Sequence, residues 1–166
     1  MTNDPSETIV CATDLSEASR CALDTAIELA SRNGARLHVL HVREVEERIE
    51  TVEGLVAREE AYERELQLEV AEEIEHVKAA RNQLPLIETV TKIRYGKAYQ
   101  EILRYAVEVR AEFIVVWTHG RTGFGHAVLG SVAERVARHA PCNVIVAKSR
   151  EVRVHLAEVL GRRWPT

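Results

Sequence analysis

Residues 115–131 read VVWTHGRTGFGHAVLGS, and this stretch decides the fold expected for the chain. An apolar run that ends at Trp117 leads into a glycine-rich loop, and the loop leads to Ser131, where a helical pattern begins. Glycines allow backbone N–H groups to approach an anion closely, and the N-terminus of a helix also favours negative charge. The stretch therefore predicts a strand, a phosphate-binding loop and a helix, in that order.

Two widespread phosphate-binding motifs do not fit this loop. Gly120 and Gly125 have the spacing of P-loop glycines, but the next two residues are His and Ala, where that motif requires Lys and Ser or Thr. A dinucleotide fingerprint that starts at Gly123 fails because Val128 occupies the position of its third glycine. Neither motif therefore accounts for the loop, and two glycines separated by two residues would mean little by themselves.

The loop is similar to that of the universal stress protein family, whose motif is Gly, two residues, Gly, nine residues, Gly, and then Ser or Thr. Gly120, Gly130 and Ser131 match this motif. Residues 9–16 and 35–42 resemble the first two strands of the family, and the resemblance covers most of residues 8–148. It implies an α/β fold that binds a nucleotide.

The chain departs from the family at two positions. The first glycine of the motif falls on Trp117, and an indole buries roughly 200 Å² of surface. The indole could fill the crevice and weaken or prevent ATP binding, stack on the base, or turn into the core, and the sequence leaves these three arrangements open. Ala12 stands where a proline usually precedes the Thr-Asp pair, and we expect this change to have little effect.

Short β-branched runs alternate with longer amphipathic segments along the chain. We expect strands over 8–12, 36–42, 87–94, 112–117 and 143–147, with helices between them. The first helix should begin after Ser16 as its N-cap and run to about Arg32, before the stop signal of Asn33 and Gly34. The fold class is therefore α/β, a Rossmann-like, doubly wound, five-stranded parallel sheet with helices on both faces.

The expected domain, 8–148, is flanked by a disordered N-terminus, 1–7, and by a C-terminal extension, 149–166, that should be helical. Within it, the insertion 43–82 holds an amphipathic helix. Its charge-rich first part, from Arg43 to about Val56, could be a loop, a second short helix or a partner surface. The apolar residues that repeat at helical spacing are Tyr62, Leu66, Val70, Ile74 and Val77.

Composition bounds the function. The chain of 166 residues is 46% hydrophobic and 29% charged, so it can form one globular domain with a core. Its net charge of -4 argues against a nucleic-acid partner. No segment resembles a signal or membrane span, so we expect a cytoplasmic protein without a membrane partner. The three cysteines are scattered in apolar stretches, as is typical of core residues.

In doubly wound sheets the ligand lies at the carboxyl ends of the strands, where the strand order reverses. The family resemblance places this crevice between the first and fourth strands. Asp14 would accept hydrogen bonds from ribose, although it could equally be a turn residue before Ser16. The full candidate set comprises Ala12, Thr13 and Asp14 around the nucleoside, Val42 against the adenine, and Val116, Trp117, Gly120, Arg121, Gly130, Ser131 and Val132 around the ribose and phosphates.

The other polar candidates are weaker. His119 and His126 lie in the loop and could contact phosphate, but polar residues are common in loops without any such role. His38 and His41 are three apart on a strand, so they should point to opposite faces and cannot form a metal-binding pair.

The sequence contains no nucleophile elbow and no zinc-binding helix motif. We therefore expect a regulatory module of the stress response that binds ATP, with Mg²⁺ alongside it, or that works without a ligand. The alternatives are an interaction module with an occluded pocket and, less favoured, a slow ATP-hydrolysing or adenylyl-transferring enzyme. Residues 143–147 form an apolar last strand that would be an exposed edge in a monomer, so we expect a homodimer and an unknown regulatory protein partner.

Overall fold

The computed structural model describes residues 7–43, 52–80, 87–118 and 130–148. These residues build a five-stranded sheet in the order β3-β2-β1-β4-β5, and every neighbouring pair is parallel. The expected doubly wound parallel sheet is confirmed. Its strands are β1 (Thr8–Thr13), β2 (Arg36–Arg43), β3 (Thr89–Tyr95), β4 (Phe113–Trp117) and β5 (Asn143–Ala147).

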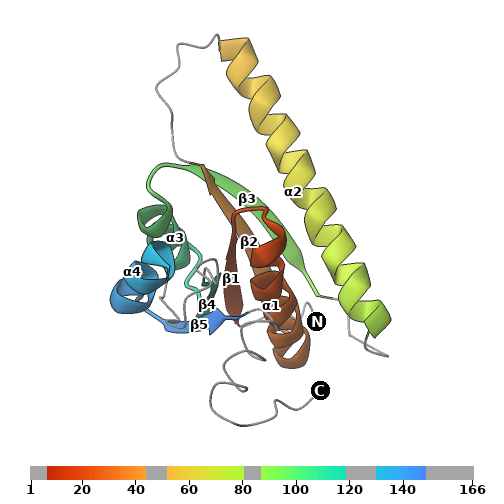
Figure 1. Ribbon diagram of the computed structural model, residues 1–166, viewed down its shortest axis with the longest axis vertical. Coiled ribbons are helices and arrows are strands. Elements are labelled where there is room, and N and C mark those ends of the chain that lie inside the picture. Colours follow the sequence, from red (N-terminus) through yellow and green to blue (C-terminus); the bar gives the residue numbers. More distant parts are fainter. Residues whose placement is uncertain (1–6, 44–51, 81–86, 119–129, 149–166) are drawn as a thin grey trace, which may run out of the picture.

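In the part of the chain that the structure describes, two helices cover each face of the sheet (Figure 1). The helices α1 (Arg20–Asn33) and α2 (Val52–Ala80) pack on one face, and α3 (Ala98–Glu108) and α4 (Ser131–His139) pack on the other. Among the described residues, no helix is both long enough and apolar enough to cross a membrane.

The strand alternation divides the core into two clusters. In β1, Ile9 and Cys11 face α1, whereas Val10 and Ala12 face α3 and α4. All four are buried, because helices cover both faces of the central strand. This is why the strand reads as an almost continuous apolar run.

The first helical segment begins and ends close to the expected residues. Ser16 caps a single 3-10 turn, Glu17–Ser19, by accepting a hydrogen bond from the Ser19 N–H, and α1 follows directly. Gly34 ends the helix in the left-handed conformation, with φ of 64°, and its N–H bonds to the Ala30 carbonyl. A left-handed φ strains most side chains, so the glycine at this position is explained.

The insertion forms one long helix, α2, of 29 residues. It already begins at Val52 and passes through Gly54, so the last part of the charge-rich stretch is not a separate short helix. The first part, 44–51, lies outside the described residues, as do the two chain ends, 1–6 and 149–166. The N-terminal end of α2 projects beyond the sheet (Figure 1).

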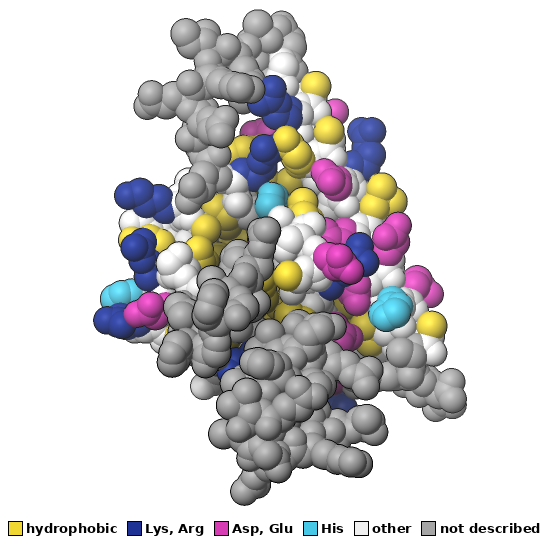
Figure 2. Space-filling model, viewed as in Figure 1, with side chains coloured by type: hydrophobic (Ala, Val, Ile, Leu, Met, Phe, Trp, Pro, Cys, Tyr) yellow, Lys and Arg dark blue, Asp and Glu magenta, His cyan; other side chains and the backbone are white. Residues whose placement is uncertain are grey.

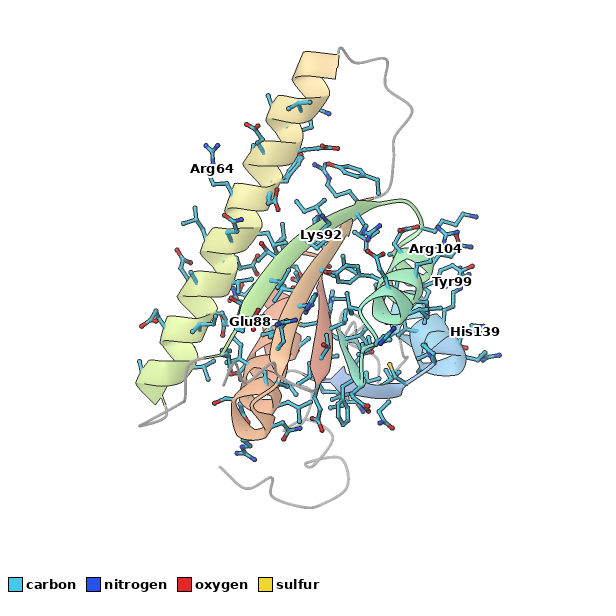
Figure 3. The ribbon with its side chains drawn as sticks, turned by 180° about the vertical axis from the view of Figure 1, so that it is seen from behind. Arg64, Glu88, Lys92, Tyr99, Arg104 and His139 are labelled. Carbon is cyan, nitrogen blue, oxygen red and sulfur yellow. The ribbon has the colours of Figure 1, made fainter. Side chains whose placement is uncertain are left out.

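The apolar stripe of α2 faces the body of the protein as expected. Leu66, Val70 and Val77 are buried against the α1 side of the core, and Ile74 packs partly buried beside them. Tyr62 holds the Arg43 guanidinium at 3.5 Å from its ring centroid. On the opposite side, Arg64 projects away from the sheet (Figure 3).

Candidate functional site

A pocket lies beside β1 and β4, at the point where the strand order of the sheet reverses. The chain runs from β1 outward through β2 to β3 and then returns to the other side of β1 as β4, so the strand order reverses between β1 and β4. The pocket spans about 620 Å³ of space, part of which is open solvent. It is lined by Ala12, Thr13, Asp14, Leu40, Val42, Ala98, Ile102, Val116, Trp117, Gly130, Ser131, Val132 and Ala133.

One wall of the pocket is apolar. Strand alternation sends Ala12, Leu40 and Val116 to the face that α3 and α4 cover. Ile102 on α3 and Ala133 on α4 close the wall from the helix side, and all five residues are almost completely buried. Val42 and Ala98 add half-buried apolar surface near the opening. This wall suits a flat, apolar group such as a nucleobase.

The loop after β1 supplies the polar wall. Asp14 accepts two hydrogen bonds through Oδ1, from the Ser16 N–H at 3.0 Å and the Ser16 hydroxyl at 2.5 Å. Thr13 accepts a bond from the Leu15 N–H at 3.0 Å, and its hydroxyl lies 2.9 Å from the Ser19 hydroxyl. The two readings of Asp14 are therefore compatible, because it builds the turn and also lines the pocket while exposed to solvent.

The N-terminus of α4 forms a third side. Gly130 is its N-cap, and its N–H donates to the Thr118 hydroxyl at 3.3 Å while its carbonyl accepts from the Glu134 N–H at 2.8 Å. The φ of Gly130 is -58°, which any residue can adopt. Gly130 has no side chain, so none stands beside Ser131, where the first N–H groups of the helix point outward. Such a helix end favours an anion.

Trp117 borders the pocket, but its side chain belongs to the opposite face of the sheet. Val116 packs in the cluster under α3 and α4, and Trp117, one residue later, packs half-buried against the cluster under α1. Of the three arrangements considered, this one corresponds to an indole turned into the core. The indole therefore does not fill the space between β1 and α4.

The structure brings nine of the eleven candidate residues to this pocket, and the remaining two, Gly120 and Arg121, lie outside the described residues. That the eleven candidate residues bind a nucleotide stays a prediction. Four lining residues were not anticipated: Leu40, Ala98, Ile102 and Ala133. The period of two in β2 would have identified Leu40 from Val42. The α3 residues carry no local signal, since only helix packing brings them to the pocket.

Other titratable groups lie outside the pocket. His38 is buried, and its Nδ1 lies 2.8 Å from the Tyr105 hydroxyl under α3. Burial, and then the Arg36 charge, lower the pKa of His38, while Glu88 opposes this shift. His41 faces the other side of β2, with Nδ1 2.9 Å from the Thr13 carbonyl oxygen. The expected opposite orientation of the two histidines is confirmed.

The described residues offer no metal site. They contain no group of three or more His, Cys, Asp or Glu side chains that could hold a metal ion. Cys11 is fully buried, and burial strongly raises the pKa of its thiol. Cys21 and Cys142 are half-buried. A buried neutral thiol behaves as a small apolar core residue, as the sequence predicted for Cys11.

Residues 5–148 match the family model described as the universal stress protein family. The chain belongs to this family. It is 31% identical to the universal stress protein YxiE of Bacillus subtilis over 145 residues, which cover 84% of this chain and 97% of that protein. It is also 33% identical to the universal stress protein MJ0531 of Methanocaldococcus jannaschii over 142 residues, covering 84% of this chain and 81% of the relative.

Solved universal stress proteins share the fold. One in complex with cAMP superposes with a TM-score of 0.62 at 22% identity and covers 87% of this chain and 98% of its own. Another, from Archaeoglobus fulgidus and in complex with dAMP, has a TM-score of 0.58 at 24% identity and covers 86% of this chain and 98% of its own. At these identities the likeness establishes the α/β architecture.

Proposed function

We propose that this protein is a cytoplasmic regulatory module that binds an adenine nucleotide in the pocket between β1 and α4. The observation that carries this proposal is the composition of the pocket, which joins an apolar wall, a carboxylate and a helix N-terminus within one space of about 620 Å³. These are the three surfaces that a base, a ribose and a phosphate require.

Each part of the nucleotide would find a matching surface. The base would lie against Leu40, Val42 and Ile102, and the ribose hydroxyls would donate to the free oxygen of Asp14. The phosphates would take hydrogen bonds from the first N–H groups of α4, near Ser131. The two solved relatives that hold cAMP and dAMP support an adenine nucleotide as the ligand class.

ATP fits these surfaces as the expected ligand. Mg²⁺ would then be held mainly by the phosphate oxygens, because Asp14 is the one carboxylate among the described lining residues and already accepts two hydrogen bonds. When bound, the ion would neutralise phosphate charge. The protein's own contribution would be to position the nucleotide.

The polar side chains that line the pocket favour nucleotide binding over catalytic turnover. Asp14 is committed to the turn with Ser16, and the described residues that line the pocket include no histidine, lysine or cysteine. Hydrolysis or adenylyl transfer needs a positioned base or metal ion to activate the attacking group. We infer that the nucleotide acts by changing the population of conformations or the affinity for a partner.

The test combines identification of a bound ligand with titration. The purified protein would be denatured and the released small molecules identified by mass spectrometry, and the apo protein would be titrated with AMP and ATP by calorimetry. Ala98→Trp places a large ring at the apolar wall and should reduce nucleotide affinity at least tenfold. Ala137→Trp, on the exposed side of α4, is the matched control and should bind normally.

The outcomes separate the candidate functions. Release of AMP or ADP together with steady product formation from ATP would favour an enzyme. If neither nucleotide binds to the folded protein, the nucleotide proposal is wrong and an interaction module with an occluded pocket takes its place. Circular dichroism of each variant checks that the fold is retained.

We also propose that the protein is a homodimer formed through β5. Among the described strands, β5 is the edge of the sheet beyond β4, and Val144, Ile145 and Val146 are partly exposed on it. An uncovered apolar edge strand invites pairing with a second chain. A regulatory protein partner is part of the same proposal, since a binding module needs a recipient for its signal.

A further inference from the structure

A second groove adjoins the pocket, between α3 and α4. The two spaces share Ala98, Ser131 and Val132, so the groove lies directly beside the pocket. The groove is lined by Lys97, Ala98, Tyr99, Ser131, Val132 and Arg135.

The charge of the groove is positive. Among the described residues, Lys97 and Arg135 are its charged lining residues, and no acidic side chain lines it. The nearest acids on the two helices are engaged elsewhere, because Glu101 pairs with Arg104 and Glu134 pairs with Arg138 at 2.7 Å. Within the described ranges, neither Lys97 nor Arg135 forms an ion pair of its own. An anion in the groove would therefore meet two uncompensated cations.

The arginine is also held in place. Its guanidinium carbon lies 5.0 Å from the centroid of the Tyr99 ring, and the Tyr99 hydroxyl accepts a hydrogen bond from Gln100 at 3.1 Å. Arg135 follows Ser131 by four residues, so both lie on the same face of α4. The guanidinium therefore lies one turn beyond the helix N-terminus, and stacking on the ring lowers the entropy lost when it binds an anion.

The surface around the groove has the same character. In the space-filling view, Lys and Arg side chains lie at the α3 and α4 side, and most of the acidic side chains lie over α1 and α2, where Lys and Arg also occur (Figure 2). Tyr99 and His139 project on the same side of the molecule, from α3 and α4 (Figure 3). Lys97 and Arg135 therefore give the groove a local positive charge although the chain carries a net charge of -4.

We propose that the groove between α3 and α4 is a subsite for a second anionic group of the bound nucleotide, so that Lys97 and Arg135 select nucleotides with two or more phosphates over monophosphates. This proposal rests on nucleotide binding in the adjoining pocket. The first phosphate would lie at the N-terminus of α4, and the next would lie over Ser131 and Val132 toward the guanidinium.

The experiment compares AMP with ATP, both titrated by calorimetry in the presence of EDTA so that no metal ion neutralises the phosphates. The wild-type protein should bind ATP about tenfold or more tightly than AMP. Arg135→Gln and Lys97→Gln should each reduce ATP affinity about fivefold, the equivalent of roughly 1 kcal/mol for a solvent-accessible charge pair, and should leave AMP affinity unchanged. Arg135→Lys should retain part of the preference.

Arg138→Gln is the matched control, because Arg138 lies on the same helix and is paired with Glu134 outside this groove. It should leave both affinities unchanged. An ATP-to-AMP ratio that stays the same in Arg135→Gln, or that falls equally in Arg138→Gln, would overturn the subsite while leaving the pocket intact. Absence of AMP and ATP binding in the wild-type protein would instead overturn the proposed function, and the subsite with it.

Discussion

The substitution Trp117→Gly tests whether the indole packs against α1 or occupies the nucleotide pocket. The indole packs half-buried against the α1 side of the core, on the opposite face from Val116 and the pocket wall. Restoring the glycine of the family motif should therefore destabilise the protein without creating new space for the nucleotide.

The expected loss of stability follows from burial. Removing a fully buried Trp side chain costs about 3–5 kcal/mol, so we expect about 2 kcal/mol from the half-buried Trp117. A glycine inside a strand adds roughly 0.5–1 kcal/mol. The total is about 3 kcal/mol, which a domain with an ordinary stability of about 5–15 kcal/mol survives.

The assay is urea unfolding followed by far-ultraviolet circular dichroism, paired with calorimetric titration of ATP. With a slope of about 2 kcal/mol per molar urea, the midpoint should fall by roughly 1.5 M. ATP affinity should stay within about twofold, a difference near 0.4 kcal/mol. Trp117→Phe keeps most of the packing, so its midpoint should fall much less.

Two results would refute this reasoning. If Trp117→Gly gains ATP affinity that the parent lacks, the indole fills the nucleotide space. If the variant loses about 1–3 kcal/mol of binding free energy at unchanged stability, the indole stacks on the base, as aromatic side chains do with unpaired bases.

Three further predictions test the fold and the site. Gly130→Glu should abolish nucleotide binding in titration, because its carboxylate would stand at the N-terminus of α4, while circular dichroism should be unchanged; an unaltered affinity would place the phosphates elsewhere. Ile145→Lys should convert the dimer to a monomer in light scattering, and a wild-type protein that is monomeric at every concentration would remove the edge-strand proposal. Because the pKa of His38 is lowered in the fold, its stabilising contribution is complete above the ordinary value of 6.5 and is lost as the pH falls through that value toward the folded pKa. Between about pH 7.5 and pH 5, the urea midpoint should therefore fall less in His38→Gln than in the parent. An equal fall of the midpoint in both proteins would contradict a lowered pKa for His38.

Much of the architecture could be predicted from local pattern. Strand and helix positions follow from the repeat of apolar residues, and each strand was placed within two residues of its observed bounds. The end of α1 at Gly34 follows from backbone chemistry alone. The crevice between the first and fourth strands came from the family resemblance, and the strand order bears out that β1 and β4 are neighbours.

Local pattern was insufficient where several arrangements share the same sequence signal. The charge-rich stretch before Tyr62 suited a loop or a short helix, and packing of Leu66 and Val70 against α1 supports one helix that extends back to Val52. Helix formation is cooperative, so a well-anchored stripe carries the adjoining charged turns with it.

The sequence by itself determined the parallel α/β class, the β1 loop with Asp14, and the helix start at Ser131, because each depends on neighbouring residues along the chain. Only the tertiary structure decided that Trp117 faces α1, that Ala98 and Ile102 close the pocket, and that Arg135 stacks on Tyr99. These contacts join residues from different helices and strands, so they depend on how the layers pack, and no short-range periodicity encodes that packing.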